Sequence, residues 1–195
     1  MCGRYDLNDT GTRIRRVFSL HDVPHFDPNA DLRPTDKALI VRLDQAGQRE
    51  AVLMRWGFAP PFAKDRKDRI NARGESVGIA YREAYRNRRC LVPANAFNEW
   101  SGEKGSKIKW RVTVKDQPLF AFAGLWDWWR DPKESDAVPV EAFTIITTSP
   151  NDILADIHDR MPVIVAESDY QPWLENGSRS LLRPLPSEAI DIAAV

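Results

Sequence analysis

Cys2 is the first residue whose type and position could do chemistry, because it follows Met1 directly. If Met1 is removed, Cys2 carries an α-amine and a thiol on adjacent carbons, a pair that no internal residue can supply. The amine, with an ordinary pKa of about 7.7–8.0, is partly neutral near pH 7, and the thiol follows at about 8.5. Such an aminothiol can condense with an aldehyde to an imine and then close a thiazolidine ring. The alternative is that Cys2 is simply a small buried hydrophobic residue.

The stretch from Arg69 to Glu75 holds a second candidate group in a basic part of the chain. Asn71 can donate and accept hydrogen bonds without carrying charge, which suits a group that holds a sugar hydroxyl or a carbonyl oxygen. Arg73, two residues on, could bind a phosphate through its planar guanidinium. An Asx-turn followed by a surface arginine would explain the same residues without any site.

Glu99 lies between aromatic residues in the segment Phe97-Asn98-Glu99-Trp100. Burial among such side chains disfavours the charged carboxylate and raises its pKa toward neutrality. A carboxyl group in that state can act as a general acid and base on an amine or a hydroxyl. The alternative is a strand whose alternation points Glu99 to water.

The segment from Ile157 to Pro162 places His158 and Arg160 between a predicted helical turn and a predicted strand. An imidazole changes its protonation state near pH 7, so His158 could move a proton in the same site. Arg160 follows His158 by two residues, the same spacing that separates Arg73 from Asn71. A histidine with a purely structural role is the alternative.

The cysteines and histidines show no spacing typical of a metal site, so we expect neither a metal ion nor another cofactor. Cys2 and Cys90 are too few for a disulfide framework and favour a reducing compartment. His21 and His25 lie in a proline-rich stretch, where we expect them on the surface. The chain shows no apolar run of membrane-spanning length and no signal sequence. We therefore expect a cytoplasmic protein that makes no membrane contact.

Charge is unevenly distributed, although the 195 residues include 28 basic and 28 acidic ones. Residues 1–111 contain 22 Lys and Arg against 14 Asp and Glu, and residues 112–195 contain 6 against 14. This asymmetry is compatible with a nucleic-acid-binding face, and equally with a salt-bridged surface. Nucleic-acid binding also needs flat or apolar groups beside the bases, for which Pro34 is a candidate. Most of the seven tryptophans are expected in the core, among them Trp110, Trp126, Trp128 and Trp129.

The hydrophobic pattern predicts many strands and few helices. Helices or helical turns are expected at 8–18, 79–88, 151–156 and 167–174, with Gly177 as a stop signal. Strands are expected at 38–43, 51–56, 90–92, 96–100, 110–115, 119–126, 142–148 and 162–166, with loops at 22–35 and 57–69 and a turn at Pro93. This pattern indicates a single α+β domain over residues 1–195, built on a curved, barrel-like antiparallel or mixed β-sheet with short flanking helices.

Together, these segments resemble the SRAP family, the SOS-response-associated peptidases or abasic-site processing proteins. The matching motifs follow the family order over nearly the whole chain. They are Met1 to Tyr5, Trp56-Gly57, Asn71-Ala72-Arg73, Cys90 to Ala94, Glu99-Trp100, Phe122 to Trp126, Phe143 to Thr148 and His158 to Pro162.

The resemblance implies the SRAP fold and, as partner, single-stranded DNA that contains abasic sites. It implies that Cys2, freed by self-removal of Met1, forms a Schiff base with the opened sugar and then a thiazolidine crosslink that shields the lesion. Peptidase and AP-lyase activities are implied as well. The other implied roles are positioning for Asn71, proton transfer for Glu99 and sugar opening or reversal for His158. Phosphate binding is implied for Arg4, Arg73 and Arg160. With DNA as the partner, we expect a monomer that is associated with the nucleoid when it acts on DNA.

Three segments of the chain depart from the family pattern, which usually reads Asn-Ile-Ala-Pro-Thr at residues 31–35 and Gly-Phe-Tyr-Glu-Trp at residues 96–100. Asp31 stands where the family usually has asparagine, Asn98 where it has tyrosine, and Phe62 where it has tryptophan. The first two bear on the DNA channel and on the surroundings of Glu99. Two other functions stay open here. One is an N-terminal-nucleophile amide hydrolase of the glutamine amidotransferase type, in which the α-amine activates the Cys2 thiol. The other is a non-enzymatic reader of modified DNA bases.

Overall fold

The computed structural model describes residues 2–59, 68–103, 105–131 and 136–195. The strands are β1 (Tyr5–Leu7), β2 (Asn29–Leu32), β3 (Lys37–Leu43), β4 (Arg49–Trp56), β5 (Asn71–Arg73), β6 (Arg89–Ala94), β7 (Ala96–Ser101), β8 (Ile108–Val114), β9 (Phe120–Trp129), β10 (Val140–Thr148), β11 (Met161–Pro162), β12 (Ile164–Val165) and β13 (Ile190–Ala194). The α-helices are α1 (Gly11–Val17), α2 (Val77–Ala80), α3 (Arg82–Asn87), α4 (Asp152–Ala155) and α5 (Tyr170–Asn176). Three 3₁₀ turns follow in the second half, η1 (Glu167–Asp169), η2 (Arg179–Leu181) and η3 (Ser187–Ala189).

Five strands close into a barrel. Hydrogen bonds join β10, β4, β3, β6 and β9 in that order, and β9 pairs back with β10. The β4–β10 pairing is parallel, whereas the other four are antiparallel. β12 extends the sheet beside β9, and β5 and β11 both pair with β10. The predicted α+β fold with a barrel-like mixed sheet is confirmed.

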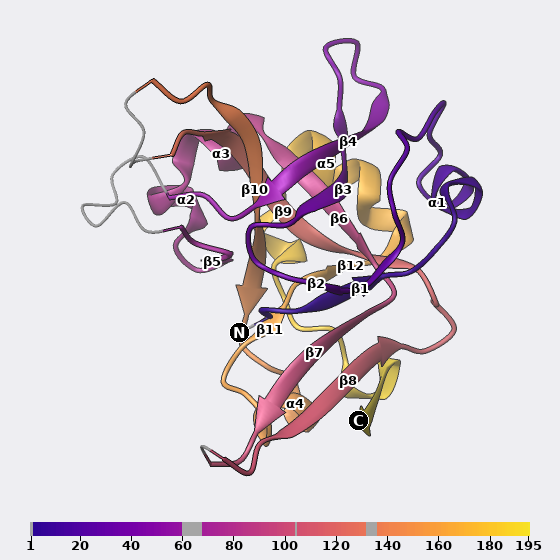
Figure 1. The fold of residues 1–195 in the computed structure, drawn as a ribbon, viewed down its shortest axis with the longest axis vertical. Coiled ribbons are helices and arrows are strands. Elements are labelled where there is room, and N and C mark those ends of the chain that lie inside the picture. The colour runs from indigo at the N-terminus through magenta and orange to yellow at the C-terminus, as the bar shows by residue number, and fades with distance from the viewer. Residues whose placement is uncertain (1, 60–67, 104, 132–135) are drawn as a thin grey trace.

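A second, antiparallel sheet has the strand order β13-β8-β7-β1-β2. One of the connections between this sheet and the barrel is a single residue, Asn95, between β6 and β7, and Figure 1 shows β7 and β8 extending away from the barrel strands. β1 lies between β2 and β7, and the backbone N–H of Asn98 donates to the carbonyl of Arg4 at 2.9 Å. The residues around Cys2 are therefore fixed beside a sheet.

One hydrophobic core fills the barrel and the space between the two sheets. The ring of Tyr5 in β1 meets Trp56 edge-on at 5.1 Å and Phe122 at 5.8 Å, and Trp56 stacks on Phe143 at 6.1 Å. All four rings are fully buried. Because they come from β1, β4, β9 and β10, this aromatic cluster attaches the N-terminal strand to the barrel.

Two short helices have side-chain caps, and a third ends at the predicted stop signal. The Thr10 side chain caps α1 by accepting from the amide of Arg13 at 3.3 Å, and Asn151 caps α4 by accepting from Leu154 at 3.0 Å. α5 ends at Gly177, whose φ of 59° is left-handed. No helix in the described part of the chain is long and apolar enough to cross a membrane.

Three expectations about the elements are wrong, and three strands were missed. The stretch 22–35 is not all loop, because β2 forms there as a partner for β1. Pro93 makes no turn and instead lies inside β6, where it pairs with Ala121. The helix expected at 79–88 is two short helices that break at Tyr81, with φ of −124°. The strands at 5–7, 71–73 and 190–194 were not predicted, because each is short and owes its conformation to its neighbours.

The tryptophans are also distributed differently from the expectation. Trp110, Trp126 and Trp129 are only partly buried, and Trp128 is 60 % exposed. The fully buried ones are Trp56 and Trp173. β9 continues to Trp129 beyond its last pairing with β6, at Leu125, and stays paired with β10 throughout. On this part of the strand Trp128 faces the surface, whereas Trp126 and Trp129 pack against the core and have arginines over their rings. The segment 60–67, which includes Phe62 and most of the predicted loop at 57–69, lies outside the described residues.

Gly124 lies where the interior of the barrel is tightly packed. It lies on β9 opposite Cys90 and Ile145, and a Cβ atom there would approach the Cys90 sulfur to 2.8 Å and a Val92 methyl to 2.9 Å. Gly124→Ala should therefore lower the free energy of unfolding by about 1–3 kcal/mol, measured by urea denaturation. Gly11→Ala is the control, because its added Cβ meets nothing closer than 3.8 Å. An equal effect of both substitutions would contradict this packing.

Candidate functional site

Cys2 is completely buried in the described structure. Its carbonyl accepts a hydrogen bond from Nδ2 of Asn71 at 2.9 Å, and its sulfur lies 3.9 Å from the carbonyl of Arg4. Burial, together with the nearby negative charge of Glu99, raises the pKa of the Cys2 thiol well above its ordinary range. The thiol is therefore protonated at neutral pH.

Asn71 is positioned by β10. It opens the short strand β5, where it pairs with Ile145, and Arg73 pairs with Thr147. Its Oδ1 is buried and has no hydrogen-bond partner within the described residues, whereas Nδ2 holds Cys2. An amide oriented in this way can anchor one group and still accept a hydrogen bond from another.

Glu99 lies in the middle of β7, opposite Trp110, and is only 2 % exposed. Of the two alternatives for Glu99, the structure shows burial and not a solvent-facing carboxylate. Burial raises the pKa of Glu99, and the charge of Asp159 acts in the same direction. The carboxyl group is thereby shifted toward the protonated state that a general acid needs.

His158 follows α4 and precedes β11. Its Nδ1 accepts from the backbone amide of Arg160 at 3.0 Å and lies 2.8 Å from an Asp159 carboxylate oxygen. These two contacts favour opposite protonation states of Nδ1. Partial burial lowers the pKa of His158, which favours the neutral ring with its proton on Nε2.

The four predicted catalytic residues come from four separate segments that meet near the start of β1. Asn71 touches Cys2 directly, and Glu99 acts electrostatically on the Cys2 thiol. The His158 loop joins them through Asp159, whose charge reaches Glu99. Figure 1 shows the N-terminal end close to β11 and to the end of β10. The arrangement combines a held main chain, a buried acid and an imidazole.

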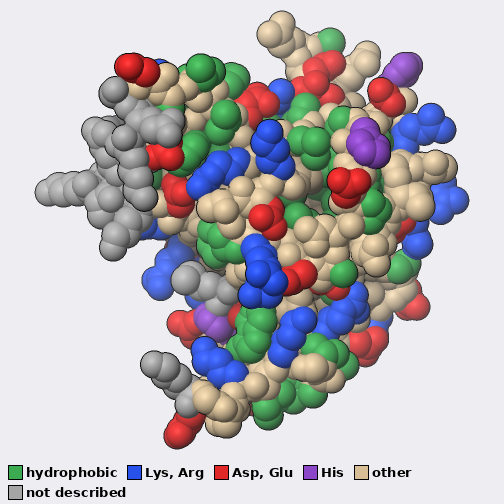
Figure 2. All heavy atoms as spheres, in the orientation of Figure 1, with side chains coloured by type: hydrophobic (Ala, Val, Ile, Leu, Met, Phe, Trp, Pro, Cys, Tyr) green, Lys and Arg blue, Asp and Glu red, His purple; other side chains and the backbone are tan. Residues whose placement is uncertain are grey.

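Three arginines lie around these four residues, and they differ in their ion pairs. Arg160 donates to both carboxylate oxygens of Glu75, at 2.7 and 2.9 Å, and to the carbonyl of Thr147 at 2.7 Å. Arg4 donates to both oxygens of Asp31 at 2.9 Å. Arg73 is exposed. Figure 2 shows Lys and Arg side chains gathered on the lower half of the face that β1, β2 and β7 occupy.

Pro34 lies exposed in a tight turn after β2. The amide of Asp36 donates to the carbonyl of Arg33 at 3.1 Å, and Thr35 adopts a φ of 79°. The third position of such a turn normally requires glycine, so a β-branched threonine there is strained. Strain of this kind is commonly found at functional sites, where the surrounding structure enforces it.

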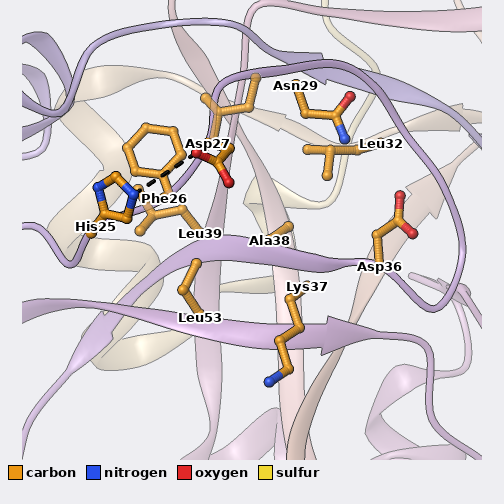
Figure 3. A pocket seen from close by; sticks show the side chains of 11 residues that line it. His25, Phe26, Asp27, Asn29, Leu32, Asp36, Lys37, Ala38, Leu39 and Leu53 are labelled. Carbon is orange, nitrogen blue, oxygen red and sulfur yellow. Dashed lines mark ion pairs between the residues drawn. The ribbon is translucent and has the colours of Figure 1, made fainter.

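A separate pocket of about 430 Å³ lies between the segment 25–32 and the strands β3 and β4 (Figure 3). Its ion pair, His25 with Asp27 at 3.8 Å, is almost fully exposed. None of the predicted site residues lines it. Within the residues that the structure describes, no group of three or more His, Cys, Asp or Glu side chains could hold a metal ion.

Several partners in the site were not predicted from the sequence. Asp6 is buried and accepts from Arg111 at 2.9 Å and from Nδ2 of Asn98 at 3.2 Å. These contacts fix β1 to β7 and β8 beside Glu99. The carboxylates Asp31 and Glu75 were missed as partners of arginines. Their pairings join residues 27 and 85 positions apart, and no local sequence signal reports such a distance.

Comparison with known proteins identifies the family of this chain. The family model described as SOS response associated peptidase (SRAP) matches residues 1–195. Abasic site processing protein YoqW of Bacillus subtilis is 35 % identical over 98 % of this chain and 90 % of its own length, and YoaM is 37 % identical over 100 % and 89 %. A crystal structure of a Bacteroides thetaiotaomicron protein covers 100 % of this chain and 92 % of its own, with a TM-score of 0.86 and 26 % identity. The chain belongs to the SOS response associated peptidase (SRAP) family.

Proposed function

We propose that this protein processes abasic sites in single-stranded DNA, and that it does so by linking Cys2 covalently to the opened sugar. The abasic-site names of its relatives support the general activity. The observation that carries the covalent step is the hydrogen bond from Asn71 to the Cys2 carbonyl beside a buried Glu99. A cysteine main chain held in place next to an acid suits chemistry at the Cys2 nitrogen.

The reaction begins with the free α-amine that Cys2 has after hydrolysis of the Met1–Cys2 bond. The amine adds to the aldehyde carbon of the ring-opened sugar, and loss of water from the carbinolamine gives an imine. The Cys2 sulfur then adds to the imine carbon, its proton passes to the nitrogen, and a thiazolidine ring results. No electrons are exchanged with another reagent, so the crosslink needs no cofactor.

The raised pKa values fit this order of events. The Cys2 thiol is held in its protonated form, so the amine is the first nucleophile. Glu99 in its acid form can protonate the leaving hydroxyl of the carbinolamine, and as carboxylate it can accept the thiol proton. The neutral His158 ring can assist in opening the sugar and in reversing the ring closure. The buried Oδ1 of Asn71 is placed to accept a hydrogen bond from a sugar hydroxyl.

DNA binding is assigned to the surface around this group. Arg73 is exposed and available to a phosphate, and Arg4 and Arg160 lie on either side with carboxylates as partners. Pro34, presented by its strained turn, is the apolar edge that would pack against a neighbouring base. Self-removal of Met1 would account for the word peptidase in the family name, because one peptide bond must break before Cys2 can react.

Crosslinking of an abasic oligonucleotide tests the function. Protein that lacks Met1 is incubated with single-stranded DNA carrying one abasic site and run on a denaturing gel. A heat-stable shifted band is expected, and Cys2→Ala should abolish it because the sulfur cannot close the ring. Cys90→Ala, which removes the other, fully buried thiol, should leave the band intact.

Intact-mass measurement of the same protein should show loss of the methionine. No band with wild-type protein, or an undiminished band with Cys2→Ala, contradicts the covalent mechanism. Release of ammonia from glutamine without any band would instead favour the amide-hydrolase alternative.

Glu99→Gln tests whether the buried carboxyl group lowers stability at neutral pH and whether it takes part in crosslinking. Because the folded pKa of Glu99 is raised, its favourable contribution to stability exists at low pH and is lost as the pH rises through the folded pKa. The neutral amide avoids that loss, so the melting temperature of the variant relative to wild type should increase from pH 4 to pH 8. Crosslinking should slow by about 100-fold or more, as expected for a lost general acid.

Glu103→Gln, an exposed substitution just beyond the end of β7, serves as the control and should change neither quantity. An unchanged crosslinking rate in Glu99→Gln would remove Glu99 from the mechanism. A stability difference that does not depend on pH would contradict the raised pKa.

A further inference from the structure

One carboxylate, that of Asp31, holds two arginines at the DNA-facing edge of β2. Arg4 donates to both of its oxygens at 2.9 Å. Arg33 donates to one of them from Nη2 at 2.6 Å and from Nε at 3.0 Å. Two guanidinium groups thus converge on one carboxylate, a geometry that also suits a phosphate group.

The carboxylate is itself firmly placed. The backbone amide of Asp31 donates to Oδ1 of Asn29 at 2.8 Å, and β2 is paired with β1 through Tyr5 and Leu32. Figure 3 shows Asn29 and Leu32 side by side at the rim of the pocket beneath this strand. Asp31 therefore stays beside Arg4 because the sheet holds it there.

The arginines do not depend on Asp31 for their position. The carbonyl of Arg4 accepts from Asn98, and its guanidinium lies 5.8 Å from the centre of the Trp100 ring. The amide of Arg33 donates to Asp36 at 2.9 Å within the Pro34 turn. Removal of the carboxylate would release both guanidinium groups without releasing the backbone that carries them.

The cluster is open to solvent, and so its ion pairs can be exchanged. The side chains of Arg4 and Asp31 are each 36 % exposed, and that of Arg33 is 58 % exposed. Ion pairs of this exposure contribute at most about 1 kcal/mol. A DNA phosphate that reached the two arginines would compete with Asp31 for the same donors.

We propose that Asp31 competes with DNA phosphates for Arg4 and Arg33, which keeps the affinity for intact single strands low. The inference rests on the proposed function, in which Arg4 lies on the DNA path. With weak non-covalent binding, the protein leaves undamaged DNA quickly. Retention then depends on the covalent bond to the abasic sugar, so Asp31 increases the selectivity for the lesion.

The test is the affinity for an oligonucleotide without an abasic site, measured by fluorescence anisotropy between 20 and 200 mM salt. Asp31→Asn keeps the shape of the side chain and removes its charge. It should bind about fivefold more tightly at the lowest salt, the ratio that corresponds to an exposed ion pair of ~1 kcal/mol. The slope of log K against log salt should steepen by about 0.7, the value for one more phosphate contact on a single strand.

Asp191→Asn is the matched control. Asp191 is also an exposed carboxylate in an ion pair, with Lys115 at 3.6 Å, but it lies on β13 at the other edge of the same sheet. It should bind intact DNA as wild type does. Equal or weaker binding by Asp31→Asn, with a melting temperature unchanged from wild type, overturns the proposal, and so does equal tightening by both variants.

A denaturing gel with the abasic oligonucleotide, run in parallel, separates this inference from the proposed function. Failure of wild-type protein to crosslink contradicts the covalent mechanism. Tighter binding of Asp31→Asn to intact DNA in that case still supports the competition at Arg4 and Arg33. Normal crosslinking with unaltered binding of intact DNA overturns the role of Asp31 alone.

Discussion

The register of β10 is the constraint on which the rest of the structure depends. This strand closes the barrel against β9, runs parallel to β4, and at its far end pairs with both β5 and β11. Asn71 faces the N-terminal segment because β5 pairs with β10 at Ile145. The His158 loop reaches the same place because β11, which follows it, pairs with Thr147 and Thr148. A shift of one residue in β10 would turn these side chains to the opposite face of the sheet.

The buried carboxyl groups of the candidate site lower the stability of the fold. The site buries Glu99 on β7 near the Cys2 thiol. On the neighbouring strand β1, Asp6 is also buried and has Arg111 and Asn98 as partners. A buried carboxyl group lowers stability at neutral pH unless its charge is compensated. Such a residue is kept where a shifted pKa is useful, and the aromatic cluster of Tyr5, Trp56 and their neighbours supplies the stability that the site itself lacks.

The sequence predicted the components of the site better than their connections. The aromatic neighbours of Glu99 left burial and a solvent-facing position equally open, whereas long apolar segments such as 142–148 predicted the central strands. The strands of Tyr5–Leu7 and Asn71–Arg73 could not be predicted, because three residues carry no periodicity and only the partner strands make them extended. Local patterns also overestimated the burial of Trp128, since hydrophobicity alone does not show that β9 extends beyond its pairing with β6.

The parallel pairing of β4 with β10 has a consequence for the order of assembly. Its partners, Arg55 with Ala142 and Trp56 with Phe143, are each 87 positions apart in the sequence, so the barrel closes only after residue 148 is available. The segment that holds Cys2 through Asn71 needs β10 as its template. A growing polypeptide that ends before β10 therefore has its aminothiol precursor but no assembled site. The candidate site is therefore assembled only after β10 has been synthesised, in the later part of chain synthesis.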